Sequence, residues 1–128
     1  MNTTNTKRTK RTSKEIEELA LEIKKFLDDH EVAGDTRIYY NGKCLEHSYG
    51  DAFSSCDEWK TINNIKPEDY FEYASGFICM SFEGDFYEVM NYSHYSVWSI
   101  ADAFENLLHK HGCYCELGNS WNLSIYDE

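Results

Sequence analysis

Four side chains of the kinds that bind zinc occupy alternate positions late in the sequence: His109, His111, Cys113 and Cys115. Structural zinc sites usually combine two separated ligand pairs, with about two to four residues between the cysteines of a pair. This run has neither feature. We therefore interpret the cysteines as small core residues and the histidines as the last turn of a helix, where positive charge is favourable. We expect no metal and no cofactor, and zinc binding by these four residues is the alternative.

Nucleophilic catalysis is not favoured either. The five cysteines are an odd number, and the sequence begins without the apolar segment of a secretion signal, so we expect reduced thiols and a cytoplasmic protein. A reactive thiolate needs electropositive surroundings, which an acidic chain does not offer. The sequence has no glycine-rich phosphate loop, dinucleotide-binding fingerprint or nucleophile elbow. We therefore expect that the protein is not an enzyme.

The charge distribution indicates the kind of partner. The 128 residues include 12 Lys and Arg and 23 Asp and Glu, for a net charge of −11. Five of the basic residues and none of the acids lie in residues 1–14, so residues 15–128 carry −16. We predict a basic flexible tail over 1–14 and a single acidic domain over 15–128 that binds a basic protein surface and no membrane. The candidates for a weak contact with RNA or DNA are the cations of the tail: Lys7, Arg8, Lys10 and Arg11.

Acidic and aromatic residues are interleaved after Pro67. Tyrosine offers a large contact area at a low cost in conformational entropy, and carboxylates pair with arginine. Proteins that bind nucleic acid carry Lys and Arg arranged to meet phosphates. A surface of carboxylates and tyrosines can compete with the phosphates for these cations. The candidate partner-binding residues are Glu68, Asp69, Tyr70, Glu72 and Tyr73.

Two elements are predicted before residue 47. Thr12 and Glu15 have the spacing of a capping box, and an apolar stripe follows, so a helix is expected that ends near Gly34. Residues 36–46 form a hairpin around Asn-Gly at 41–42, a pair that suits a type I′ turn. The stripe comprises Ile16, Leu19, Ala20, Ile23, Phe26 and Leu27, and the hairpin register places Arg37 opposite Glu46 and Ile38 opposite Leu45.

The second half of the sequence contains both clearly predicted elements and one ambiguous segment. Residues 47–66 have a loop-like composition, Pro67 begins a short helix, and 77–82 form a strand. Residues 85–91 are either a short helix, which is favoured, or the second strand of a hairpin. A longer helix has Ser96 as its N-cap and stops at Gly112.

A last hairpin joins 113–117 to 121–125, with residue 117 opposite 121. This register puts six side chains on one face: Cys113, Cys115, Leu117, Trp121, Leu123 and Ile125. The predicted fold class is α+β, with two amphipathic helices packed on one face of a mainly antiparallel sheet in a single domain.

Three segments resemble small acidic proteins carried by phages and conjugative elements of Gram-positive bacteria. They are Tyr-Phe-Glu-Tyr at 70–73, Met-Ser-Phe-Glu-Gly at 80–84, and the segment 114–123 with its Glu-Leu-Gly-Asn and Trp-Asn-Leu. That group includes anti-CRISPR proteins that inhibit type II RNA-guided nucleases. The resemblance implies a non-enzymatic inhibitor of a CRISPR effector nuclease in the cytoplasm of the bacterial host. The alternative is a regulatory or structural interaction module of a mobile element whose basic tail contacts nucleic acid.

Overall fold

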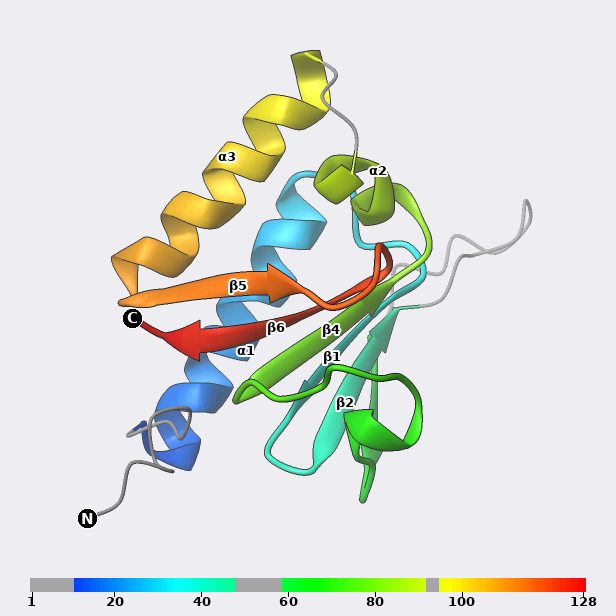
Figure 1. Ribbon diagram of the computed structural model, residues 1–128, viewed down its shortest axis with the longest axis vertical. Helices are drawn as coiled ribbons and strands as arrows, with labels where there is room; N and C mark the ends of the chain where they lie inside the picture. Colours follow the sequence, from blue (N-terminus) through cyan, green and yellow to red (C-terminus); the bar gives the residue numbers. More distant parts are fainter. Residues whose placement is uncertain (1–10, 48–58, 92–94) are drawn as a thin grey trace.

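The computed structural model describes residues 11–47, 59–91 and 95–128 (Figure 1). These residues form three α-helices, six strands and one short 3-10 helix. In chain order the elements are α1 Ser13–Asp29, β1 Thr36–Tyr40, β2 Lys43–His47, β3 Trp59–Asn63, η2 Pro67–Asp69, β4 Ile78–Phe82, α2 Asp85–Asn91, α3 Tyr95–Lys110, β5 Cys113–Leu117 and β6 Asn122–Asp127. None of the described helices is long and apolar enough to cross a membrane.

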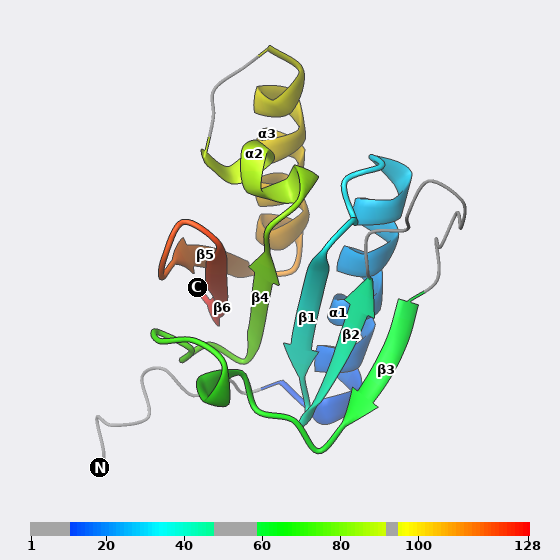
Figure 2. The ribbon, with the colours of Figure 1, turned by 90° about the vertical axis from the view of Figure 1, so that its right-hand side faces the viewer.

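The six strands form one antiparallel sheet in the order β3-β2-β1-β4-β6-β5 (Figure 2). The predicted α+β class and the single domain are confirmed, but the predicted number of two helices is wrong. The third helix is α2, which covers the segment 85–91 for which helix was the favoured alternative. It has only seven residues, and so short an apolar pattern did not predict a third helix packed on the sheet.

One apolar core lies between the helices and one face of the sheet. Five of the six residues in the predicted stripe of α1 are buried, and Phe26 is partly buried. Phe86 of α2 contacts both Phe82 of β4 and Phe104 of α3 edge to face, with ring centroids 5.1 Å apart in each pair. Because strand residues alternate between faces, the other face of the sheet is left for a different cover. The sheet contributes to this core Ile38, Tyr40, Leu45, Ile78, Met80, Leu123 and Ile125.

The start of α1 is as predicted and its end is not. The capping box at Thr12 and Glu15 is present, but the helix ends at Asp29 instead of near Gly34. The reason is a left-handed residue, Glu31, with φ 58°. It reverses the chain so that the N–H of the next residue donates to the carbonyl of Leu27 at 2.9 Å, which is the Schellman arrangement.

Replacing Glu31 with glycine is expected to raise the free energy of unfolding by about 0.5–1 kcal/mol, because only glycine adopts this φ without a steric cost. Urea denaturation followed by circular dichroism measures the change. Glu31→Ala is the control, since alanine also lacks freedom at positive φ and should give no gain. An equal gain in both variants would mean that the carboxylate near the C-terminus of α1 is the source, and would contradict this explanation.

The first hairpin has the predicted register. Arg37 is opposite Glu46, Ile38 is opposite Leu45, and residues 41–42 both have positive φ as a type I′ turn requires. Beyond it, the loop predicted over 47–66 is wrong at 59–63, where β3 pairs with β2 at the edge of the sheet. The burial of this strand is weak and its sequence polar, so no alternation marks it. Residues 48–58 lie outside the described part of the chain.

The register of the last hairpin is shifted by two residues from the prediction, because Leu117 is opposite Leu123 and not opposite Trp121. The side chain of Asn122 accepts a hydrogen bond from the N–H of Asn119 at 2.5 Å and so closes a longer loop. Trp121 therefore lies outside β6 and packs on the opposite face of the sheet from Leu123. The predicted N-cap Ser96 is also displaced, because α3 already begins at Tyr95.

Candidate protein-binding surface

The second face of the sheet is covered by residues 64–77, which connect β3 to β4 and include η2. We call this segment the covering loop. In Figure 2 it lies in front of the sheet, whereas α1 lies behind it. The candidate residues predicted from the sequence all belong to it, so the way it is held decides what surface the protein presents.

An aromatic cluster holds the middle of the covering loop. Phe71 is buried and meets two rings nearly at right angles, Tyr39 of β1 and Trp121, each with ring centroids 5.6 Å apart. Ile65 and Cys79 belong to the same buried cluster. This apolar contact fixes the side of the loop that faces the sheet.

Buried polar side chains of β6 hold the backbone of the covering loop. Asn122, 1% exposed, donates to the carbonyl of Glu72 at 3.1 Å. Ser124, also 1% exposed, donates to the carbonyl of Tyr73 at 3.0 Å and accepts from the N–H of Ser75 at 3.3 Å. The loop backbone thus receives the hydrogen bonds that a neighbouring strand would otherwise supply, and its position is set by specific partners.

At its end the covering loop touches the sheet backbone directly. The N–H of Phe77 donates to the carbonyl of Ile125 at 3.0 Å. A Cβ on Gly76 would lie 2.3 Å from that same carbonyl oxygen, so only glycine allows this approach. Tyr73 is held in a left-handed conformation with φ 65°, an uncommon state for a tyrosine. The loop is therefore tightly constrained at both positions.

The five candidate residues are all exposed on this loop, and Glu68 also lines a cleft between the loop and the sheet. Tyr70 is 54% exposed and Tyr73 is 64% exposed. Glu68, Asp69 and Glu72 are exposed beside them. The structure thus leaves all five predicted residues accessible on the covering loop, while their role in binding stays a prediction.

The carboxylates of the covering loop differ from many others in the molecule because they have no ion-pair partner among the described residues. Several acids elsewhere are paired, such as Glu46 with Arg37, Asp29 with Lys25 and Glu22 with Lys110. The negative charge of Glu68, Asp69 and Glu72 is consequently not offset locally. It is available to an external cation.

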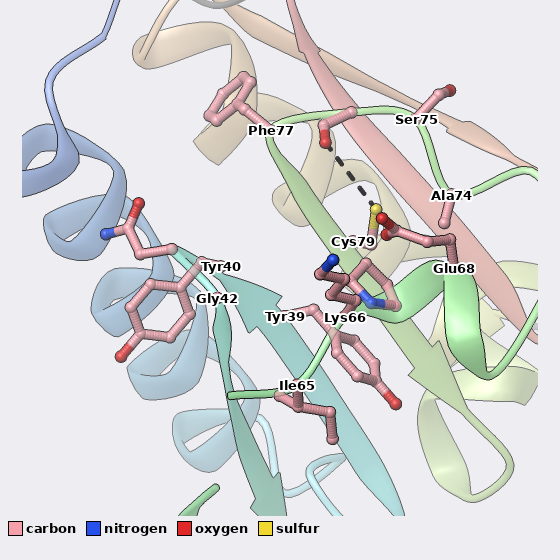
Figure 3. A pocket seen from close by; sticks show the side chains of 13 residues that line it. Tyr39, Tyr40, Gly42, Ile65, Lys66, Glu68, Ala74, Ser75, Phe77 and Cys79 are labelled. Carbon is pink, nitrogen blue, oxygen red and sulfur yellow. Dashed lines mark hydrogen bonds between the residues drawn. The ribbon is translucent and has the colours of Figure 1, made fainter. Parts of the chain in front are cut away.

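A cleft of about 360 Å³ lies between the covering loop and the ends of β1 and β4 (Figure 3). Cys79 lies in it, with its Sγ 4.0 Å from the carbonyl oxygen of Gly76. Burial raises the pKa of the Cys79 thiol, and burial likewise raises the pKa of Cys44 to about 12. Both thiols are therefore protonated at neutral pH and are poor nucleophiles.

The His and Cys run does not converge on one point. His109 Nδ1 lies 2.6 Å from a carboxylate oxygen of Glu128, and His111 Nε2 lies 2.8 Å from one of Glu22. Cys113 is buried in the core, and burial raises the pKa of Cys115 to about 12. Over 11–47, 59–91 and 95–128, no group of three or more His, Cys, Asp or Glu is placed to hold a metal ion.

Part of the predicted tail is in contact with the domain. Ser13 and Lys14 belong to α1. Arg11 Nε lies 2.6 Å from a carboxylate oxygen of Asp127, and its guanidinium also donates to the carbonyl of His111. Arg11 is thus occupied, and the other three cations proposed to contact nucleic acid lie in residues 1–10, outside the described residues.

No protein-family model, curated protein or solved structure matches this chain. The sequence did not point to Asn122 and Ser124, the β6 residues whose side chains bond to the backbone of the covering loop. Their signal was the alternation of polar and apolar residues along 122–125, which indicates a strand with one polar face turned to a cover.

Proposed function

We propose that this protein is a non-enzymatic inhibitor that binds the basic nucleic-acid-binding surface of an RNA-guided CRISPR effector nuclease. One observation carries the proposal. Two exposed tyrosines, Tyr70 and Tyr73, stand in a fixed loop among three carboxylates that have no ion pairs within the described residues. Exposed aromatic anchors beside unpaired carboxylates are features of a surface that binds a partner of the opposite charge.

The rigidity of the covering loop supports a binding role. Its backbone is bonded to Asn122 and Ser124, and Phe71 is buried against two rings. A surface that is already ordered loses little conformational entropy when it binds, so more of the contact energy contributes to affinity.

The kind of partner is supported by charge and by the resemblance of the three sequence segments. CRISPR effectors hold their guide–target duplex in a positively charged channel and read a short DNA motif with arginines. An acidic domain of −16 over residues 15–128 is attracted to such a channel and competes there with phosphates.

The test is binding of the purified protein to a guide-loaded type II nuclease, with and without target DNA. We expect Tyr70→Ala and Tyr73→Ala each to weaken binding about tenfold, as truncation of an interface anchor commonly does. The control is Leu21→Ala, which removes a side chain of α1 that is 44% exposed and should leave affinity unchanged. Affinity should also fall as NaCl is raised, because exposed charges are screened.

Two results would contradict the proposal. One is no binding, or equal binding by the wild type and both tyrosine variants. The other is loss of binding on deletion of residues 1–10 with the tyrosine variants unaffected, which would favour the mobile-element module that contacts nucleic acid through its tail. The deletion stops before Arg11 so that its contact with Asp127 is kept.

A further inference from the structure

We propose that a cavity of about 280 Å³ beside Tyr70 holds an arginine side chain of the basic partner. This inference rests on the proposed function and names the chemical group that the surface takes up. The cavity lies between the covering loop, the start of β1 and the end of β4. This volume is near the lower limit of the roughly 300–1,000 Å³ of ordinary small-molecule sites, so the cavity suits a small group such as one side chain.

Aromatic rings form much of its wall. They come from three separate parts of the chain: Tyr39 of β1, Tyr70 and Phe71 of the covering loop, and Trp121 before β6. Tyr39 contacts both Phe71 and Tyr70, with centroids 5.6 and 6.2 Å away respectively. The face of an aromatic ring attracts a cation, and a planar guanidinium can also stack on it.

Two carboxylates line the same cavity. Asp35 and Glu83 are adjacent because β1 and β4 are paired, and the N–H of Glu83 donates to the carbonyl of Asp35 at 3.2 Å. Both residues are exposed, and neither side chain has a hydrogen-bond or ion-pair partner among the described residues. Two free carboxylates beside aromatic rings offer the bidentate pairing that arginine prefers.

The chain's own Arg37 also lines the cavity but does not reverse its charge. Its Nε donates to Glu46 at 2.7 Å, and Nη1 donates to the hydroxyl of Tyr39 at 3.4 Å. Its guanidinium carbon lies 5.9 Å from the ring centroid of Tyr70. Because Glu46 balances Arg37, the charge left in the cavity is that of Asp35 and Glu83. An anion would be repelled by these two carboxylates, whereas a second guanidinium finds two unpaired acceptors.

The test uses a hexa-arginine peptide, with a hexalysine peptide for comparison, titrated into the full chain by calorimetry at low salt. The double variant Asp35→Asn/Glu83→Gln should bind hexa-arginine about tenfold more weakly, because two charge-assisted contacts are lost. Asn tolerates the positive φ of residue 35, so the variant should fold, and a thermal melt checks this. The matched control is Asp102→Asn/Glu105→Gln, which removes the same charge from exposed positions of α3.

We expect the control to bind like the wild type and the wild type to prefer arginine over lysine. Equal weakening by both double variants, equal affinity for the two peptides, or no binding of hexa-arginine would each overturn the inference. Failure of the proposed function looks different, because hexa-arginine would bind as expected while the guide-loaded nuclease would not. Nuclease binding that is lost in the tyrosine variants but intact in Asp35→Asn/Glu83→Gln would overturn the cavity's role alone.

Discussion

Gly76→Ala is expected to lower the free energy of unfolding by about 3 kcal/mol, at the upper end of what forcing extra volume into a packed site costs. The added Cβ would lie 2.3 Å from the carbonyl oxygen of Ile125 and 2.7 Å from its nitrogen. Both are backbone atoms of a central strand and cannot rotate away. Relief requires the covering loop to move off β6, which breaks the hydrogen bond from Phe77 to Ile125.

Gly42→Ala is the matched control for this loss. Gly42 has φ +76°, and a Cβ there would meet nothing within 4 Å, so alanine suffers only the backbone cost of about 1–2 kcal/mol. Urea denaturation followed by tryptophan fluorescence measures both variants. If Gly76→Ala loses no more than Gly42→Ala, close contact with Ile125 is not what requires glycine at position 76.

Asn122→Asp is expected to cost about 3 kcal/mol at neutral pH, because a buried charge is left without a compensating partner. The change preserves the shape of the side chain. It keeps the acceptor for the N–H of Asn119 but replaces the donor to the carbonyl of Glu72 with a second acceptor. Two oxygens with no hydrogen between them would then face each other at a site 1% exposed.

This deficit should depend on pH in a defined direction. Burial favours the neutral acid, so the folded-state pKa of the new carboxyl lies above the unfolded value of about 3.9. The penalty is therefore full above the folded pKa and disappears below the unfolded pKa, where the protonated acid again donates to Glu72. The free-energy difference from the wild type is measured at each pH, with Asn106→Asp, an exposed position on α3, as the control. A deficit that is the same at about pH 4 and at neutral pH would contradict the assignment of Asn122 as the donor.

Local signals in the sequence predicted local structure well. The capping box at Thr12 and Glu15 and the Asn-Gly turn at 41–42 each depend on residues a few positions apart, and both are present as predicted. The end of α1 was wrong because Glu31 occupies a left-handed position that usually belongs to glycine, and no residue type marks it. The shifted last hairpin depends on one side chain, Asn122, which bonds within its own loop.

The candidate surface was predictable only in part. The interleaved acids and aromatics of 67–73 predicted a binding segment, but the pattern could not show that Phe71 is buried while Tyr70 and Tyr73 are exposed. That choice depends on Trp121, which reaches the covering loop because of the order of strands in the sheet. The same holds for Asp35 and Glu83, which are 48 positions apart and meet only because β1 pairs with β4. Such long-range pairing leaves no pattern in a single sequence.

The place of β6 has a consequence for synthesis of the chain. It follows every other described element, yet it lies inside the sheet between β4 and β5. At about 5–20 residues per second, a ribosome completes β4 some seconds before it adds Asn122, and during that time one edge of β4 has no partner. The covering loop has been made by then, but Asn122 and Ser124, which hold it, have not. A chain interrupted before residue 122 would display the acids and tyrosines on an unanchored loop beside an open strand edge, so incomplete products should be substrates for chaperones and proteases and poor binders of any partner.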